Sequence, residues 1–512
     1  MIAKIKALFQ KLNNLSPAAK ASVWFVIANI ALKGISFITT PIFTRLLAVE
    51  DYGATSVFVT WEGVISAFAT LSLSGGVYNV AQTKYEEDID AYTSSMVSLT
   101  FVASLLVYTA CIIFNLFVPS VFELSTPFLI FMWIQSFTNA IIAFWLVRRR
   151  FVYDYKSVII YTFANSLLSP IIAIIAILIF PAHAAYAKVV GAGIAGIIMG
   201  IVLCVIDYKK GKKVYDKAYW NYALKFNLPL IPHYLSSTLL NRGDKLMINS
   251  LIGTAEAGIY GIAHSITGLI GLITHAINQA LIPFTLQSVK ARNFKELNKM
   301  ITSCVLLVAA VCVGVMLFAR EGILIFATEE YLNAVYFIPP LTMATLFSFI
   351  YGIVGNIMFY YEKTWQMSVI TICCAVVNLV TNYFGIKYFG EIAAGYTTLL
   401  CSAIQMLAYY FVVKHYEKNL DEIVDLRWFL LIMLVYVGFM AYSIIFTHNF
   451  WARIGLLAVI LILVIVFHKK IIELFQTMLK KDNAEEEMEI TNEQTEFNDL
   501  EPVETREVVT KE

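Results

Sequence analysis

The sequence is poor in charge. Lys, Arg, Asp and Glu together make up 14% of its 512 residues, whereas about a quarter of the residues of a soluble domain are charged. Hydrophobic residues reach 59%, and the mean hydropathy is +0.73. This balance excludes a soluble globular domain, so we expect an integral membrane protein, with no nucleic acid as a partner.

Cysteine motifs are absent as well. The seven cysteines show neither a CxxC spacing nor a Cys/His ligand spacing, and all of them lie inside apolar runs. Cysteines in such places are most simply small buried hydrophobic residues. We therefore expect no metal site and no disulfide framework.

Sequence motifs for chemistry are also missing. There is no GxxxxGK[ST] nucleotide loop, no segment between apolar runs large enough for a nucleotide domain, and no Ser/His/Asp constellation in the inner loops. We expect no catalytic residues, no bound cofactor and a protein that is not an enzyme. A coupling H⁺ or Na⁺ is left open.

Long apolar runs are what the sequence does contain. A membrane-spanning helix needs about 20 mostly apolar residues, and about fourteen segments meet this condition. They lie near residues 21–47, 54–78, 93–118, 127–147, 157–180, 185–206, 222–251, 257–284, 300–319, 337–360, 365–386, 391–413, 428–446 and 452–468. The prediction is an all-α polytopic membrane protein with about 14 transmembrane helices.

Basic residues distinguish the two sides of these spans. The connections on one side, with "RRRFVYDYK" and "KKGKKVYDK" among them, contain 26 Lys and Arg residues, and those on the other side contain about 7. Cytoplasmic connections carry such an excess. We therefore predict an even number of spans, with the N- and C-termini both in the cytoplasm.

The two ends of the chain differ from its apolar body. Residues 1–20 place apolar side chains on one helical face with lysines beside them, which predicts a cytoplasmic amphipathic segment. Residues 482–512 hold 12 acidic and 2 basic residues, against 24 acidic and 35 basic residues in the remainder. We expect residues 469–512 to form an acidic, largely disordered cytoplasmic tail.

An internal repeat divides the body into two halves. "LLAVEDYGATS" (46–56) and "LIGTAEAGIYG" (251–261) align at an offset of 205 residues, which places Gly53 over Gly258. The same offset maps the first six spans onto spans seven to twelve, as in transporters built from two repeats. We predict two pseudo-symmetric six-helix halves, two C-terminal helices, and a site between the halves. The predicted boundaries are 21–207, 221–414 and 427–468.

Polar residues form a stripe along the first predicted span. Asn29, Lys33, Ser36 and Thr40 are spaced 4, 3 and 4 residues apart on an otherwise apolar helix, which places them on one face. Such a stripe faces water or a ligand rather than lipid. Lys33 is a candidate ligand for a substrate, and Glu62 in the second span is a candidate coupling group. An ordinary ion pair between these two is the alternative.

Span seven carries a second polar face. His233, Asn241 and Asp244 share this face, Lys245 lies about 100° further round, and Arg242 points nearly opposite Asp244. We expect Asp244 and Lys245 to look into a cavity near its outer end and Arg242 to reach the outer headgroups by snorkelling. An Asp244 and Lys245 pair that only holds the halves together is the competing interpretation, and His233 is more ordinarily a packing donor than a proton relay.

Two further bases complete the candidate set. Lys225 lies near the start of span seven, which borders the predicted cavity. Arg45, at the outer end of span one, is a candidate gate residue, or more simply a headgroup anchor or turn stabiliser.

The stretches "TPIFTRLLAVEDYGATSVF" (40–58) and "NRGDKLMINSLIGTAEAGIYGIA" (241–263) resemble the oligosaccharide flippases of the polysaccharide biosynthesis family, within the multidrug/oligosaccharidyl-lipid/polysaccharide exporter superfamily. The length and the six-plus-six-plus-two layout agree with this resemblance. It implies a protein of the bacterial cytoplasmic membrane that moves a polyprenyl-diphosphate-linked sugar repeat unit from the inner to the outer leaflet. It also implies alternating access through a cationic cavity. A diphosphate needs positive charge at low dielectric, and Lys33, Lys225 and Lys245 are bases on spans that border the predicted cavity.

The resemblance further implies a lipid-linked oligosaccharide and membrane lipids as partners, with a polysaccharide polymerase or chain-length regulator as a further one. The product would be O-antigen, capsule or exopolysaccharide, and a murein-precursor flippase follows the same logic. A cation-coupled drug exporter competes, but it predicts more carboxylates than lysines in the cavity. A polysaccharide polymerase would need a large outer loop, and the outer loops here are short.

Overall fold

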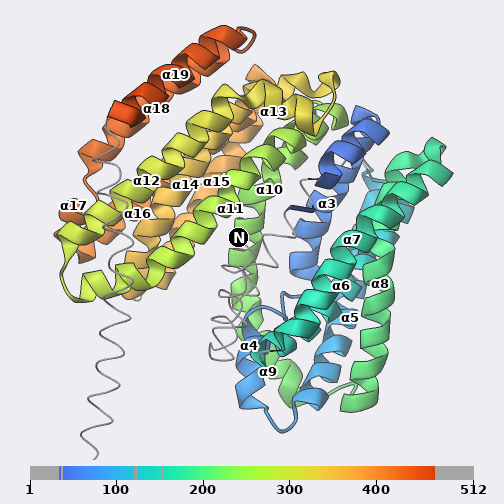
Figure 1. Ribbon diagram of the computed structural model, residues 1–512. Helices are drawn as coiled ribbons and strands as arrows, with labels where there is room; N and C mark the ends of the chain where they lie inside the picture. Colours follow the sequence, from blue (N-terminus) through green and yellow to red (C-terminus); the bar gives the residue numbers. More distant parts are fainter. Residues whose placement is uncertain are drawn as a thin grey trace, which may run out of the picture.

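The computed structural model of the protein describes residues 34–35, 38–119, 121–122, 124–152, 154–361 and 363–466. Every regular element within these residues is helical (Figure 1). Three residues of the predicted stripe, Asn29, Lys33 and Ser36, lie outside the described residues. So do the predicted amphipathic segment at 1–20 and the acidic tail at 469–512.

The first half of the chain begins with a helical segment at 38–46. The helices that follow are α3 (Val49–Ala69), α4 (Gly76–Lys84), α5 (Ile89–Phe117), α6 (Thr126–Phe151), α7 (Tyr155–Ile179), η1 (Pro181–His183) and α8 (Ala184–Gly211). Ser125 and Asp154 precede α6 and α7, and the Asp154 side chain accepts a hydrogen bond from the Ser157 backbone N–H, which caps α7.

The second half of the chain follows. Its helices are α9 (Lys217–Asn227), η2 (Leu228–Leu230), α10 (Ile231–Leu251), α11 (Thr254–Lys290), α12 (Phe294–Leu317), α13 (Ala319–Phe326), η3 (Glu329–Tyr336), α14 (Ile338–Tyr360), α15 (Thr364–Phe389) and α16 (Ala393–Tyr416). The last elements are α17 (Leu420–Ile423), α18 (Leu426–Ile445) and α19 (Phe450–Val466).

The span predicted at 54–78 is wrong in its bounds, because α3 begins at Val49 and ends at Ala69, and a turn separates it from α4. The later helices coincide with the predicted spans from 93–118 onward, with one correction. The single span predicted at 222–251 is divided into α9, η2 and α10. Pro229 lies in η2 and Pro232 at the start of α10, and a proline lacks the N–H that a continuous α-helix requires.

By length and composition, ten of the described helical segments are able to cross a membrane. They are α5, α6, α7, α8 with η1, α11, α12, α14, α15, α16 and α18. Helices α3 and α10 have 21 residues each but are more polar, because they carry the charged side chains that meet between the halves. The all-helical polytopic fold is therefore confirmed.

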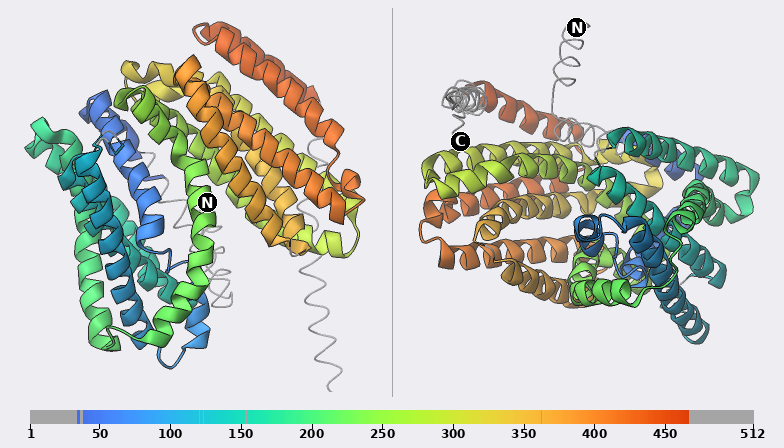
Figure 2. Two further views of the ribbon diagram at one scale, coloured as in Figure 1. Left: turned by 180° about the vertical axis from the view of Figure 1, so that it is seen from behind. Right: turned by 90° about the horizontal axis from the view of Figure 1, so that it is seen from below.

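The two halves form separate helical bundles that meet at one end and diverge toward the other (Figures 1 and 2). They meet where the first turns of α3 lie against the last turns of α10 and the first turns of α11. We call this the closed end, residues 49–59 and 245–261. Helix α4 lies at the opposite, diverging end of the first half, and α9, which comes first in the second half of the chain, packs there against α4 and α5.

Glycine allows the close contact at the closed end. A Cβ atom placed on Gly53 would lie 2.0 Å from the carbonyl oxygen of Thr254, and one on Gly258 would lie 3.0 Å from the Cα of Gly53. The two glycines aligned by the repeat therefore touch each other across the halves. Around them an apolar cluster joins Val57 of α3 to Ile248 of α10 and to residues of α11, α13 and η3. The closed end is thus tightly packed and has no room for a side chain at its crossing point.

Helices α18 and α19 form a hairpin along the outside of the second half (Figure 1). Met433 and Tyr436 of α18 belong to the apolar core of the second half. An ion pair adds to this packing: Arg453 of α19 donates to both carboxylate oxygens of Glu321 in α13 at 2.6 Å, and to the carbonyl of Leu317 at 2.6 Å. The guanidinium is almost fully buried, with 3% of its side chain exposed. This pairing satisfies a charge that would be costly to bury alone.

Candidate functional site

The contact between α3 and α10 carries the first candidate residue. The Nη1 of Arg242 donates to the backbone carbonyl of Val59 at 3.3 Å and would lie 2.3 Å from a Cβ on Gly63. Arg242 therefore does not snorkel to the outer headgroups as expected. Because α3 packs directly against α10 and Gly63 leaves space, the guanidinium lies across the two halves instead.

A cavity of about 240 Å³ lies beside this contact, toward the closed end, with lining residues from α3, α6, α8 and α10. Two lysines line it from opposite halves, Lys188 of α8 and Lys245 of α10. The Nζ of Lys188 donates to the hydroxyl of Thr55 at 2.9 Å. Both side chains are partly buried. In the described part of the chain, neither forms an ion pair with a carboxylate.

Glu62 of α3 is a carboxylate within electrostatic reach of Arg242. Its Oε1 accepts a hydrogen bond at 3.0 Å from Asn139 of α6. The predicted alternative partner, Lys33, lies outside the described residues. Lys188 and Lys245 are thus the charged residues that line the cavity between the halves, whereas the first turns of α3 and α11 at the closed end are acidic.

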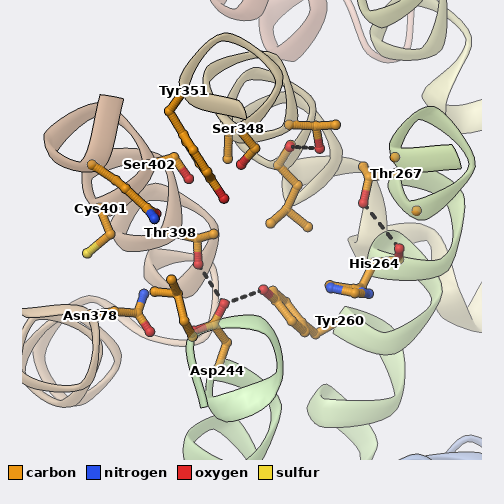
Figure 3. Close-up of a pocket in the computed structure, with 17 residues that line it drawn as sticks. Asp244, Tyr260, His264, Thr267, Ser348, Tyr351, Asn378, Thr398, Cys401 and Ser402 are labelled. Carbon is orange, nitrogen blue, oxygen red and sulfur yellow. Dashed lines mark hydrogen bonds between the residues drawn. The ribbon is translucent and has the colours of Figure 1, made fainter. Parts of the chain in front are cut away.

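Asp244 occupies a different place from the one expected. It is one residue from Lys245 on α10, but its carboxylate is buried inside the second half, with 4% of the residue exposed. It accepts hydrogen bonds from the hydroxyls of Tyr260 in α11 at 2.7 Å and Thr398 in α16 at 2.6 Å, and from the amide of Asn382 in α15. Figure 3 shows Tyr260 and Thr398 converging on this carboxylate. Asp244 is thus held by neutral donors from three helices, with no ion pair to Lys245.

A second cavity, of about 230 Å³, extends from Asp244 within the second half. Hydroxyl and amide groups line much of it, from Thr267, Thr345, Ser348, Asn378, Ser402 and Gln405 (Figure 3). Oxygen ligands of this kind suit a proton or an alkali cation rather than a transition metal. Accordingly, the described residues contain no group of three or more His, Cys, Asp or Glu side chains placed to hold a metal ion.

Arg45 and Thr44 connect the first half to α13 of the second. The Thr44 hydroxyl donates to the carbonyl of Phe326 at 2.7 Å, and Arg45 donates to the carbonyls of Leu324 and Ile325 at 3.3 and 3.3 Å. These are the last carbonyls of α13, which have no partner within the helix and attract a cation. Arg45 therefore lies at a contact between the first half and α13.

The remaining predicted residues do not gather at one place. Lys225 is exposed on α9, away from the closed end. Thr40 lies in the helical segment before α3, and its carbonyl accepts from Thr44 at 3.2 Å. The side chains of His233 and Asn241 lie outside the described part of the chain, although both residues are on α10.

Sequence reasoning missed two sets of residues. Lys188 is the one charged residue in the first 22 positions of α8, "AAYAKVVGAGIAGIIMGIVLCV", and a charge in an apolar span is itself a signal of function. Tyr260, Asn382 and Thr398 gave no comparable signal, because they meet Asp244 only through the packing of α10, α11, α15 and α16.

Comparison with known proteins places this geometry in context. The profile of a family described as "Polysaccharide biosynthesis protein" matches residues 18–289, and that of the MatE family matches residues 229–384. The chain is similar to the "Lsg locus putative protein 1" of Haemophilus influenzae, with 21% identity over 381 residues, which cover 72% of this chain and 92% of that protein.

Two solved structures share the fold. "Lipid II flippase MurJ, inward closed conformation" has a TM-score of 0.62 and 16% identity, covering 88% of this chain and all of that one. An inward-facing multidrug resistance MATE family transporter of the MOP superfamily has a TM-score of 0.56 and 13% identity, covering 78% of this chain and 99% of that one. The matched families are families of membrane transporters and not of enzymes. Since the first profile covers more than half of the sequence, the chain belongs to the polysaccharide biosynthesis protein family.

Proposed function

We propose that the protein is a flippase that moves a polyprenyl-diphosphate-linked oligosaccharide from the inner to the outer leaflet for surface polysaccharide assembly. The observation that carries this proposal is a cavity between the halves whose charged lining residues are both lysines. Lys188 and Lys245 line it from opposite halves, and Arg242 donates across the contact beside it to the carbonyl of Val59 in α3. A diphosphate is the part of such a substrate that requires cationic partners at low dielectric.

The orientation of the protein in the membrane is inferred in this proposal from the ends of the helices. Helix α6 ends in Arg148, Arg149 and Arg150, α8 in Lys209 and Lys210, and α11 in Lys290. All these ends are remote from the closed end, at the side where the halves diverge (Figures 1 and 2). Because basic connections stay in the cytoplasm, the diverging side is the cytoplasmic one. The protein is then closed to the outside, ready to receive a substrate from the inner leaflet.

Coupling to an ion gradient is assigned in this proposal to Asp244. A carboxylate that is buried among hydroxyl and amide groups, without a basic partner in the described residues, binds a proton or an alkali cation readily. Asp244 lies on α10, as do Arg242 and Lys245. Binding of the coupling ion at Asp244 would therefore be linked through α10 to movement of the substrate-binding residues. Asp244 thus replaces Glu62 as the candidate coupling group.

The proposal is tested by restoration of surface polysaccharide. A flippase-null bacterium that supplies a lipid-linked repeat unit receives the wild type, Arg242→Ala, Lys245→Ala or the control Lys210→Ala, at matched membrane levels. We expect the wild type and Lys210→Ala to restore the polysaccharide and the two junction variants to lose most of the activity. Lys210 is a suitable control because it is an exposed base at the C-terminal end of α8, outside the cavity between the halves.

The same experiment separates the competing functions. A wild type that restores none of several lipid-linked substrates, but lowers the accumulation of a cationic dye, would replace the flippase by a drug exporter. Restoration that survives both junction substitutions would show that the diphosphate is held elsewhere.

A further inference from the structure

The connection between α11 and α12 is strongly basic. It reads "KARNFKELNK" and contains four bases and one acid. Lys290, Lys295 and Lys299 are exposed, and 71% of the Arg292 side chain is exposed. We call these four bases the 290–299 patch. The patch lies at the end of α11 that is remote from the closed end, on the side where the halves diverge (Figure 1).

The positive charge of the 290–299 patch has little acidic compensation. In the described part of the chain, neither Lys290 nor Lys295 forms an ion pair. Arg292 lies 3.9 Å from a carboxylate oxygen of Glu417, which is the limit of an ion pair. An exposed surface with this excess of positive charge attracts an acidic partner.

The chain leaves the described structure on the same side of the second half. Helix α17 packs against the first turns of α12, where the Asn298 amide donates to the carbonyl of Ile423 at 2.9 Å. Helix α18 begins directly after α17, and α18 and α19 form a hairpin (Figure 1), so α19 returns to this side and ends at Val466. The chain continues for 46 residues beyond Val466.

The last part of this continuation is strongly acidic. Residues 482–512 hold 12 acidic and 2 basic residues, and a segment of 31 residues reaches about 100 Å when fully extended. In the orientation proposed above, anionic headgroups of the inner leaflet repel this segment, whereas the 290–299 patch attracts it. Because both belong to one chain, their binding is intramolecular, and the high effective concentration compensates for weak individual ion pairs.

We propose that the acidic tail, residues 482–512, docks on the 290–299 patch of its own chain. Opposite charge and a shared side of the molecule support this partner. A docked tail keeps anionic lipid headgroups away from the inner ends of α11 and α12. Its contacts are between exposed charges, so ionic strength controls how much of the tail is docked. The inference does not depend on which substrate is transported.

Distances between two spin labels test the docking. One label is placed at the exposed position Ala291→Cys in the patch and the other at Asn498→Cys in the tail, in the full-length protein without its native cysteines. Nanodiscs of neutral lipid with one copy each ensure that only the chain's own tail reaches the patch. We expect a short, narrow distance population at low salt. It should be lost in about 1 M salt, where charges are screened beyond about 3 Å.

Two triple variants locate the contact. The patch variant replaces three bases of the patch with glutamine: Lys290→Gln, Arg292→Gln and Lys295→Gln. The control variant removes the same charge from three exposed bases at the C-terminal end of α8: Lys209→Gln, Lys210→Gln and Lys212→Gln. The patch variant should lose the short distance population at low salt, and the control variant should keep it. Exposed side chains are replaced in both variants, so the packing of the helices is preserved.

Several results would overturn the proposal. A broad distribution in the parent at low salt would show that the tail does not dock. Equal loss in both triple variants would show that the tail responds to overall charge and not to the patch. A short population that survives the patch variant or high salt would show that these charges do not hold the tail. A short population in neutral lipid that disappears in nanodiscs with phosphatidylglycerol would assign the patch to anionic headgroups instead.

Discussion

Replacement of Gly53 by alanine tests whether the closed end opens and closes. A Cβ on Gly53 would lie 2.0 Å from the carbonyl oxygen and 2.8 Å from the carbonyl carbon of Thr254. These are backbone atoms, so no change of rotamer relieves the collision. The halves have to separate at this point, or one of the helices has to bend.

The size of the effect follows from the packing. Overfilling a well-packed contact costs about 1–3 kcal/mol. Alanine also favours a helix over glycine by about 1 kcal/mol, but α3 is a helix in both states of a transporter, so this gain does not alter the balance between them. The closed state should therefore lose a factor of about 5–150 in population relative to the opened state.

Spin labels measure this change directly. Glu50 of α3 and Glu329 of η3 are both exposed at the closed end and belong to different halves. Labels on cysteines at these two positions, in a variant without the seven native cysteines, should show a longer distance population in Gly53→Ala than in the parent. The matched control is Gly314→Ala in α12, where a Cβ would meet no atom within 4 Å.

The reasoning depends on a contrast between these two substitutions. If Gly53→Ala gave the same distance distribution as the parent and as Gly314→Ala, the collision would be absorbed locally. The closed end would then not be a contact that opens during transport.

Three further predictions concern other parts of the structure. Asp244→Asn keeps the size of the side chain but removes its charge, so an imposed Na⁺ or H⁺ gradient should no longer accelerate transport in liposomes; acceleration equal to that of the wild type would contradict the coupling role. Arg453→Ala leaves Glu321 without its partner and should destabilise the α18–α19 hairpin, by less than the roughly 3–5 kcal/mol of a fully buried pair because Glu321 is 32% exposed, measured by urea-induced unfolding in micelles. The hydrogen bond from Ser157, with help from Arg149, lowers the pKa of Asp154. The cap of α7 therefore stabilises the helix above the ordinary carboxyl pKa, and this stability is lost as the pH falls through the lower folded-state pKa. Hydrogen exchange at 152–157 should rise at that pH, and an unchanged exchange rate would show that the cap is unimportant.

The sequence predicted most of the helices. Apart from the run at 222–251, apolar length predicted the spans from α5 onward, and the alignment of Gly53 with Gly258 found two residues that touch in the structure. Local pattern failed at α9 and α10, where two prolines divide a run that reads as one span. The mean hydropathy of a run does not reveal such a break in the helix.

The site was only partly predictable, for a physical reason. Helical periodicity gives the direction of a side chain around its own axis, but not which neighbour faces it. Asp244 and Lys245 were placed on adjoining faces of α10, yet one is enclosed by α11, α15 and α16 and the other meets a cavity shared with α8. Only the packing of helices far apart in the sequence decides between these surroundings.

That division of α10 has a consequence for how such a protein can change. One face of α10 lines the cavity inside the second half, and another face lines the cavity between the halves. In the proposed mechanism the coupling ion and the transported substrate bind in separate cavities, and the single helix α10 contacts both. Substitutions in the cavity between the halves can then alter which substrate is transported without changing the ion site. Substitutions in the cavity around Asp244 can change which ion is used while the substrate stays the same.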